Sequence, residues 1–445
     1  MLADTNDPAY VTATRPHTSS VDQHPVRVAV VGQPSDIPQA LQEVDELSRS
    51  SGRPLQVVPQ ATGHGAGAVV DEGVVLLDTS RLTDVTVDPD TRTAVVGAGA
   101  TWSQVNAVAE QHGLLALAGS SPSVAVCGYT FGGGIGWLVR RDGLASSTLR
   151  AVHYVDGDGS LRVASDDATD EMDREAIWAF RGAGGVGIAH TLELDLVPVA
   201  DLHAGALLWS ADALAELLAA WSGVIASLDA SVSSSISVLH VPPAPPFPEG
   251  LRGRPAVHLA IAAPDGPEGA LPLIDAMRAV AEPLMDTWGP TDAAGLARIH
   301  LDPPTVTPAV GDARWLDGTT PQIAAELLAV AAAEDSAVVM AELRHLAGAP
   351  VPARDGAVVT PPGDFIFHAV GSLGLVPRDR IEETFARLRA VWSSADAGHT
   401  PGSWVEGAAA VPDALPAEVR DRARAAADAV DPGHRIHRSR LLGEQ

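Results

Sequence analysis

The chain has 445 residues, an apolar content of 46% and a formal net charge of −27. This length allows two domains with separate cores, and the negative charge argues against nucleic acid or an anionic membrane surface as a partner. The sequence contains no lysine, which excludes Schiff-base enzymes, pyridoxal-phosphate enzymes and Walker-type phosphate loops.

Three features of the sequence predict a cytoplasmic protein. The single cysteine forms no internal disulfide, as expected in a reducing compartment. The amino-terminal residues lack a basic start followed by an apolar run, so no secretory signal is evident. No stretch approaches the roughly 20 continuous apolar residues of a membrane-spanning helix. We therefore expect no membrane partner.

The first 80 residues predict alternating strands and helices after a polar start. Residues 1–24 are polar, and we expect them to be loose or laid over the surface. Short apolar runs predict buried strands at 26–31, 55–58 and 74–77. Between the first two strands, apolar residues recur every three or four positions from Ile37 to Leu47, which predicts a helix with one buried stripe.

Two glycine-rich stretches, residues 57–67 and 117–136, follow apolar runs. Glycine leaves backbone N–H groups bare, so that an anion can approach them closely. His64 stands in the middle of the first stretch, flanked by Gly63 and Gly65. The pattern indicates a backbone cradle for a phosphorylated cofactor, with one side chain reserved for it. Two ordinary tight turns and a surface histidine would give the same spacing.

Two other glycine strings resemble nicotinamide-dinucleotide fingerprints without their structural context. After the expected strand 93–96, Gly97 and Gly99 precede a helix, but Trp102 occupies the third glycine position and prevents close packing. The string 182–187 satisfies G-x-G-x-x-G, but it follows a helical segment and opens a strand, which is the reverse of the required order. We reject both as nicotinamide sites.

From about residue 201 the pattern changes to strands and longer helices rich in alanine and leucine. The expected strands cover 203–209, 232–240, 256–263, 336–344 and 364–370. The expected helices cover 211–227, 267–282, 319–333, 377–393 and about 414–429. This alternation suits an antiparallel sheet backed by helices.

At the two glycine-rich stretches, the chain resembles the FAD-binding flavoproteins of the vanillyl-alcohol oxidase / p-cresol methylhydroxylase (PCMH) type, and within them the berberine-bridge-enzyme-like branch. In that branch, a loop reading R-S-G-G-H holds the pyrophosphate and ties its histidine to the flavin 8α-methyl group. Residues 60–64 read Q-A-T-G-H here, so the histidine and the glycine before it remain. A second family motif matches residues 118–136, with shorter matches up to Ile188. The resemblance is good over 22–200, weak over 201–400, and recovers at the C-terminus.

The resemblance implies an α+β fold with three parts. Residues 22–200 would form a two-part FAD-binding domain of the PCMH type. Residues 201–400 would form a substrate domain, an antiparallel sheet backed by helices. The segment 401–445 would return to the FAD domain, because the family closes with a segment similar to the one around Asp431.

The same resemblance implies FAD as the cofactor, attached through His64 only. Some members form a second bond through a cysteine, but Ser121 occupies that place here. Val126 falls where the family controls oxygen access, although an ordinary packing residue would fit there equally, and Tyr129 takes the place of a family histidine near the flavin. The residues expected at FAD are Thr62, Gly63, His64, Gly65, Ala66, Gly119, Ser120, Ser123, Val124, Val126, Gly128, Tyr129, Gly132, Gly133, Gly134, Val186, Gly187 and Ile188.

The catalytic residues are less evident. The family often presents Y-x-N-F near the C-terminus, and the corresponding run here is W-V-E-G at 404–407. Trp404 could stack on a substrate. Glu406 could serve as the base if burial raises its pKa, and a solvated loop carboxylate is the alternative.

Several polar residues lie on expected strands of the second domain. His258, His368 and the run from Glu342 to His345 could be structural, and the alternation of Glu342 and Arg344 onto one face would also suit a polar substrate. No Cys/His/carboxylate cluster supports a metal site, and no G-x-S-x-G elbow supports a hydrolase.

Two functions follow from the resemblance. The first is an FAD-dependent oxidoreductase, an oxidase, that moves a hydride from an alcohol, sugar-like or secondary-metabolite substrate to flavin N5 and then to oxygen. The second is a flavin-binding protein without net redox turnover, such as a structural-cofactor cyclase or a degenerate binding module. The partners implied are a small-molecule substrate and molecular oxygen, without nucleic acid or membrane; the sequence does not determine the oligomeric state.

Overall fold

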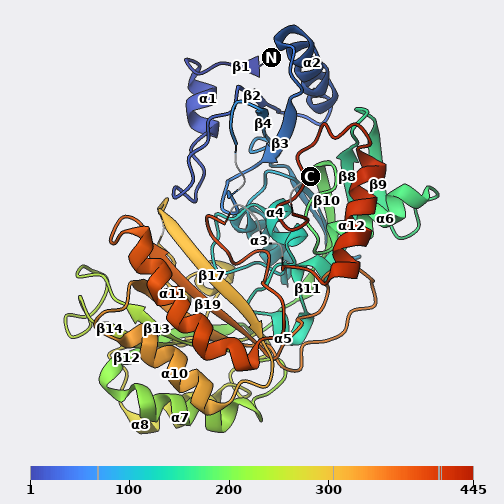
Figure 1. Cartoon of the computed structure of the whole chain (residues 1–445). Coiled ribbons are helices and arrows are strands. Elements are labelled where there is room, and N and C mark those ends of the chain that lie inside the picture. The colour runs from blue at the N-terminus through green and yellow to red at the C-terminus, as the bar shows by residue number, and fades with distance from the viewer. Residues whose placement is uncertain (1, 68–69, 304, 409–410, 412, 444–445) are drawn as a thin grey trace.

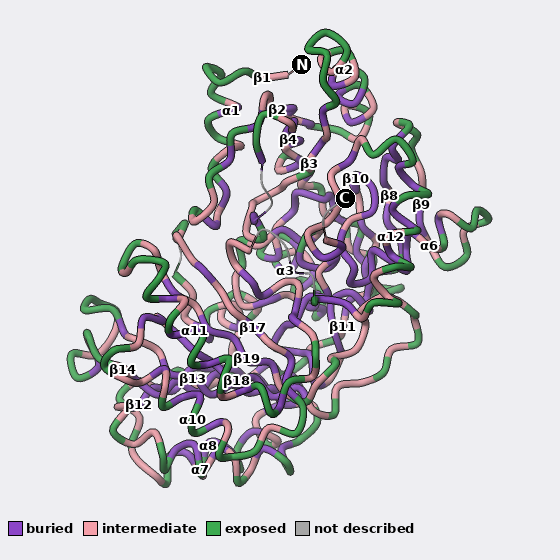
Figure 2. Tube along the Cα trace, in the orientation of Figure 1, coloured by how far each residue is buried: buried purple, intermediate pink, exposed green. Residues whose placement is uncertain are grey.

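The computed structural model describes residues 2–67, 70–303, 305–408, 411 and 413–443. Figure 1 shows two halves of the molecule, one above the other. The upper half contains two small sheets, and the lower half contains one large sheet with helices on its outer face. In Figure 2, buried residues are concentrated along the sheets, whereas the outward sides of the helices are exposed.

The first small sheet contains the β-α-β opening expected from the sequence. Its order is β1-β2-β4-β3, with β2, β4 and β3 parallel and β1 antiparallel to β2. Its strands are β1 (Leu2–Ala3), β2 (Arg27–Val30), β3 (Gln56–Gln60) and β4 (Val74–Asp78). Helix α2 (Asp36–Ser51) joins β2 to β3 and buries the predicted apolar stripe. The polar segment before residue 25 provides β1 and helix α1 (Pro8–Ala13), so much of it is built into the fold.

The second small sheet is antiparallel throughout, in the order β5-β6-β10-β8-β9. Its strands are β5 (Val85–Asp88), β6 (Thr93–Gly97), β8 (Leu149–Val155), β9 (Leu161–Ser165) and β10 (Ile188–Asp195). The helical segments around it are α3 (Trp102–Ala109), η1 (Glu110–His112), α4 (Val126–Phe131), α5 (Val139–Asp142), η2 (Ala145–Thr148) and α6 (Glu171–Phe180). A two-stranded pair, β7 (Leu114–Leu115) and β11 (Val197–Pro198), closes this half.

The large sheet runs in the order β15-β12-β14-β13-β18-β19-β17, with β16 pairing to β12, and each pair is antiparallel. Its strands are β12 (His203–Ser210), β13 (Ser233–His240), β14 (Pro255–Ala263), β15 (Met285–Asp286), β16 (Gly289–Pro290), β17 (Ala309–Leu316), β18 (Val338–His345) and β19 (Phe365–Ser372). Its helical segments are η3 (Ala211–Ala213), α7 (Leu214–Ile225), α8 (Leu271–Val280), α9 (Ala293–Leu296), α10 (Pro321–Ala332), α11 (Arg378–Trp392) and η4 (Ser393–Ala395).

Alternation along β18 decides which side chains of the large sheet meet the upper half. Ala341 and Leu343 belong to the core shared with the covering helices. Because neighbouring strand residues point to opposite faces, Glu342 and Arg344 point away from those helices, toward the upper half. The sheet therefore presents a charged patch at the junction of the two halves.

The carboxy-terminal segment returns to the upper half, which confirms the expected arrangement. Helix α12 (Ala417–Val430) packs on α6, and beyond it Ile436 forms a parallel bridge with Val57 of β3. Figure 1 shows α12 beside α6 and β9, away from the large sheet of the lower half. The carboxy-terminal segment thus contributes to the same region as the first glycine-rich stretch.

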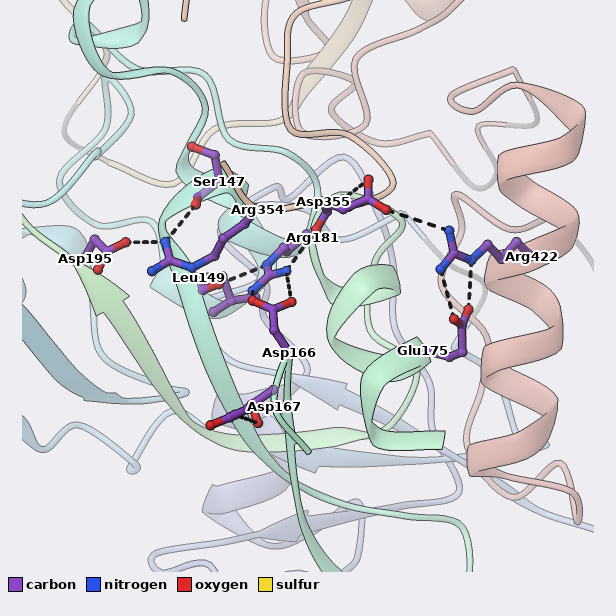
Figure 3. Close-up of polar contacts among 12 residues, drawn as sticks. Ser147, Leu149, Asp166, Asp167, Glu175, Arg181, Asp195, Arg354, Asp355 and Arg422 are labelled. Atoms are coloured by element: carbon purple, nitrogen blue, oxygen red, sulfur yellow. Dashed lines mark hydrogen bonds and ion pairs between the residues drawn. The ribbon is translucent and has the colours of Figure 1, made fainter. Parts of the chain in front are cut away.

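Two arginines, one buried and one exposed, fasten segments from the second half of the chain to the upper half, as Figure 3 shows. Arg181 is fully buried; its guanidinium donates to both carboxylate oxygens of Asp166, at 2.7 and 2.8 Å, and to the carbonyl of Asp355, at 2.9 Å. Arg422 of α12 donates two hydrogen bonds, of 2.8 and 2.9 Å, to Glu175 of α6. Bidentate pairs of this kind fix orientation as well as distance.

Candidate active site

A cavity of about 1640 Å³ lies where the two halves and the carboxy-terminal segment meet. Both glycine-rich stretches line it from the upper half, and strands β13, β18 and β19 line it from the lower half. Residues 402–406 and 436–441 of the carboxy-terminal segment complete the wall. Three parts of the chain that are distant in sequence therefore share one internal surface.

The glycines of the two loops serve different purposes. Gly63 has a φ of +70°, which favours glycine, and it turns the chain sharply after β3. Gly119 is required for packing, because a Cβ there would lie 2.8 Å from the ring of Tyr129. At Gly128, a Cβ would meet nothing within 4 Å, so this glycine faces open space beside the cavity.

His64 projects from the first loop between two partners. Its Nε2 lies 2.9 Å from the hydroxyl of Ser123 on the second loop, which joins the two glycine-rich stretches across the cavity wall. Its ring is stacked on His17, with centroids 3.5 Å apart and planes inclined by 16°. Burial, aided by repulsion from His17, lowers the pKa of His64 to about 4, so the imidazole is neutral near pH 7.

Four charged side chains, three of them buried and Asp302 half-buried, form a network on the large-sheet side, which we call the charge network: His300, Asp302, Glu342 and Arg344. His300 lies between two carboxylates, with Nδ1 2.6 Å from Asp302 and Nε2 2.9 Å from Glu342. Arg344 approaches Glu342 from the other side, at 3.0 Å. Two acids and two bases leave the network with no net charge when all four are ionised.

The pKa shifts within the charge network keep it ionised. Burial opposes the protonation of His300, but Asp302 and Glu342 outweigh burial and raise the pKa of His300 to about 10. Burial likewise opposes ionisation of the carboxyls, yet His300 holds the pKa of Asp302 at about 2. Arg344 and His300 together hold the pKa of Glu342 well below its usual range. Each charge is therefore compensated by a neighbour rather than by water.

The guanidinium of Arg344 is held between two indoles. Its central carbon lies 3.8 Å from the ring centre of Trp137 and 4.6 Å from that of Trp404. Stacking of this kind suits the planar guanidinium and offsets part of its loss of hydration. Trp404, one of the two predicted catalytic residues, is thus buried between the charge network and the cavity.

Glu406, the second predicted catalytic residue, forms a pair with His368 on the cavity wall. Its Oε2 lies 3.2 Å from Nε2 of His368 on β19, and the ring of His368 stands edge-on to Trp404 at 4.8 Å. Burial raises the pKa of Glu406, but the attraction of His368 outweighs it and the net pKa is below the ordinary value. The expectation of a raised pKa is therefore wrong, since it considered only burial.

Comparison with known proteins identifies the upper half. Residues 28–165 match the family described as "FAD binding domain". FAD-linked oxidoreductase pytB of Aspergillus terreus is 29% identical over 198 residues, which cover 43% of this chain and 23% of that protein. (R)-6-hydroxynicotine oxidase of Paenarthrobacter nicotinovorans is 29% identical over 177 residues, covering 39% of this chain and 37% of that protein. These matches span well under two thirds of each relative.

Solved structures share the whole fold. The berberine bridge enzyme-like protein 1 of Physcomitrella patens aligns with a TM-score of 0.81 at 16% identity, covering 100% of this chain and 97% of that one. 6-Hydroxy-D-nicotine oxidase of Arthrobacter nicotinovorans aligns with a TM-score of 0.77 at 20% identity, covering 98% and 96%. The chain therefore has the fold of the berberine-bridge-enzyme-like proteins, and its residues 28–165 are similar to the FAD binding domain family. The expected α+β fold, with its PCMH-type domain and its helix-backed antiparallel sheet, is confirmed.

The residues that line the cavity fit FAD. The two glycine loops that the family uses for FAD line one continuous wall, and Gly128 leaves room beside the cavity. Tyr129 Oη and Ser403 Oγ are buried in that wall without a hydrogen-bond partner among the described residues, so each is free to bond to a ligand. Arg438 and Arg440 line the same wall from the carboxy-terminal segment, where Asp428 pairs with Arg438 and backbone carbonyls accept hydrogen bonds from Arg440.

Most of the residues predicted at FAD lie on this wall. Those that line the cavity are Thr62, Gly63, His64, Gly65, Ala66, Gly119, Ser120, Ser123, Val124, Gly128, Tyr129, Gly132 and Gly187, together with Trp404 and Glu406. Those that do not line it are Val126, Gly133, Gly134, Val186 and Ile188. Val126, predicted to control oxygen access, is fully buried in the core of the upper half.

Sequence reasoning missed several residues that line the cavity. His17 and Thr18 come from the polar amino-terminal segment, which carries no periodic signal. His300 and Asp302 come from a loop, and their partner Glu342 is some 40 positions away. Within the described ranges, no three His, Cys, Asp or Glu side chains are placed to hold a metal ion, and no helix is long and apolar enough to cross a bilayer.

Proposed function

We propose that this protein is an FAD-dependent oxidase that takes a hydride from a carbon–hydrogen bond of an alcohol-type substrate and passes the electrons to oxygen. The observation that carries the proposal is the Glu406–His368 pair, because it places a proton acceptor in the cavity that the two glycine loops also line. The relatives named as oxidases and oxidoreductases support the same reaction class.

Bound FAD would supply the hydride acceptor, and the protein would supply position and acid–base chemistry. Glu406 is ionised at neutral pH and accepts the proton of the substrate hydroxyl, while His368 holds its carboxylate in place. Trp404 packs against His368 and limits its rotation. Tyr129 stays protonated, because burial raises its pKa, and its hydroxyl is available as a hydrogen-bond donor to the ligand.

A group of apolar residues on the cavity wall favours a substrate with an apolar body over a sugar. The group comprises Leu239, Val241, Phe247, Leu301 and Met340. The first four also belong to one apolar cluster next to β12. Sugar sites need many hydrogen-bond donors and acceptors. Apolar side chains instead favour an apolar ligand, because burying its surface against them lowers the free energy of binding. We therefore favour the secondary-metabolite class among the alternatives left open by the sequence.

We also propose that FAD is attached covalently through His64. The support is the position of this neutral imidazole in the loop that the family uses for attachment. Protein precipitated with acid should keep its flavin, and His64→Ala should release it. Flavin that leaves wild-type protein in acid would contradict the attachment without affecting the redox proposal.

The redox proposal is tested by anaerobic mixing of purified protein with cinnamyl alcohol, a terpene alcohol and a disaccharide. We expect the flavin absorption to bleach with one of the alcohols and hydrogen peroxide to appear when air returns. Glu406→Gln should slow bleaching by about 10²–10⁴-fold at unchanged FAD content. The exposed Glu418 provides the matched control, Glu418→Gln. If the protein binds FAD but none of the alcohols bleaches the flavin, the result would favour the alternative function, a flavin-binding protein without net redox turnover.

A further inference from the structure

An amino-terminal strap, residues 14–20, runs along the glycine loop that carries His64. The backbone N–H groups of His17 and Thr18 donate to the carbonyls of Thr62 and Gly63, at 3.1 and 3.2 Å. The hydroxyl of Thr18 donates to the carbonyl of His64 itself, at 2.7 Å. The strap therefore fixes the backbone at and just before His64.

The strap contacts the glycine loop on one side and residues at the start of β17 on the other. Pro16 packs so closely on the loop that a Cβ at Gly63 would lie 2.6 Å from it. On the other side, the backbone N–H of Ser19 donates to the carbonyl of Thr307 at 3.0 Å, and Ser20 Oγ donates to the carbonyl of Ala309 on β17 at 2.5 Å. The position of the strap is thus set by the large sheet as well as by the loop.

The side chain of His17 covers one face of the His64 ring. The centroids are 3.5 Å apart with an angle of 16° between the planes, and both residues line the cavity. At its edge, the His64 ring is held by Ser123, 2.9 Å from Nε2. A ring held at one face and one edge has a single orientation, and in that orientation Nδ1 is the nitrogen not occupied by Ser123.

The stacked geometry excludes proton exchange between the two imidazoles. The lone pairs and N–H bonds of an imidazole lie in the ring plane, so two parallel rings at this distance cannot hydrogen-bond to each other. His17 therefore acts on His64 through its position. It also disfavours a proton on His64, because two stacked imidazolium rings would repel.

We propose that His17 is a positioning residue for covalent flavin attachment, which holds the His64 imidazole in the orientation from which it bonds to the 8α-carbon of FAD. The inference rests on the proposed attachment through His64. The loop lacks the Arg, Ser and first Gly of the family motif at 60–62, and the strap supplies a different support at the same place.

The attachment balances with dioxygen as the oxidant. The new C–N bond replaces one C–H bond of the 8α-methyl group and the N–H bond of the imidazole. The two electrons and two protons released reduce the flavin ring, and dioxygen takes them and leaves as hydrogen peroxide. The role of His17 ends with placing the nitrogen that forms the bond, because a correctly placed reactant removes much of the entropic barrier.

The test compares His17→Ala, His17→Leu and His17→Phe with wild-type protein, each produced without flavin and then mixed with FAD in air. Attachment is followed by the flavin that remains with acid-precipitated protein, and total FAD binding by quenching of flavin fluorescence. We expect His17→Ala and His17→Leu to bind FAD but to attach it about 10- to 100-fold more slowly. His17→Phe, which keeps a flat ring, should attach it at close to the wild-type rate. The exposed His112 provides the control, His112→Ala.

Wild-type attachment rates in both His17→Ala and His17→Leu would overturn the proposal. So would a His17→Phe variant as slow as His17→Leu, since the flat ring would then not be the cause. Wild-type protein that binds FAD but never retains it in acid would overturn it as well. A wild-type protein that binds no FAD at all would instead refute the proposed function, so the two failures are distinguishable.

Discussion

Replacing His300 with asparagine tests whether the charge network stabilises the fold. His300 is buried between Asp302 and Glu342, and its pKa is raised from 6.5 to about 10. One pKa unit corresponds to about 1.4 kcal/mol, so the protonated imidazole contributes up to about 5 kcal/mol at low pH. Removing one member of a buried ion pair costs about 3–5 kcal/mol in other proteins, which is of the same size.

The sign of the pH dependence follows from the direction of the shift. Because the folded-state pKa lies above the unfolded one, the stabilisation is complete below pH 6.5 and is lost as the pH rises through 10. Wild-type protein should therefore lose about 2 kcal/mol from this group between pH 6.5 and 8.5. His300→Asn should be less stable at pH 6.5 and should lack that slope.

The assay is urea unfolding followed by tryptophan fluorescence at the two pH values, with His112→Asn as the control at an exposed histidine. The difference between wild type and His300→Asn should shrink as the pH rises. The reasoning is refuted if the two proteins lose stability in parallel, or if the difference at pH 6.5 is below about 1 kcal/mol, since the network would then contribute little.

Three other substitutions test the cavity wall and the link between the halves. Gly311→Ala should slow hydride transfer by about 10²-fold at normal FAD content, because the new Cβ would overlap the carboxylate of Glu406; stopped-flow bleaching measures it. Gly119→Ala should weaken FAD binding, since its Cβ would press on the ring of Tyr129 at 2.8 Å; fluorescence titration with FAD measures it. Arg181→Met should lower the free energy of unfolding by about 3–5 kcal/mol, because it leaves two carbonyls and a carboxylate without their donor; urea unfolding measures it.

Matched controls separate these effects from substitution in general. At Gly223, a Cβ would meet nothing within 4 Å, so Gly223→Ala should change neither FAD binding nor bleaching. Arg174 is exposed on the same helix-and-loop region as Arg181, and Arg174→Met should change stability by less than about 1 kcal/mol. Normal bleaching in Gly311→Ala would show that Glu406 is not the base.

The upper half could be predicted in detail because its signals are local. The strands before each glycine-rich stretch and the stripe from Ile37 to Leu47 are patterns within a few residues, and the structure places both stretches on one cavity. The motif also supplied residues that the wall does not include, such as Val126 and Ile188, because a motif lists neighbours in sequence without saying which of them point inward.

The charge network could not be predicted, because it depends on which strands become neighbours. Glu342 and Arg344 alternate on a strand whose earlier residues are apolar, and this alternation was the available signal. Nothing near them in sequence indicates that a loop at His300 would supply their partner. Isolated charged side chains usually lie in water. Glu342 and Arg344 are fully buried because their pairing offsets the free energy lost when they leave water.

The way in which distant segments share the cavity wall also sets an order of events during synthesis. His17 and Thr18 leave the ribosome more than 400 residues before Ser439 and Arg440, and all four line the same wall. If the amino-terminal part folds early, it forms only one side of the cavity wall. FAD can therefore be enclosed only after translation has passed Arg440, so capture of the cofactor follows the synthesis of the whole cavity wall.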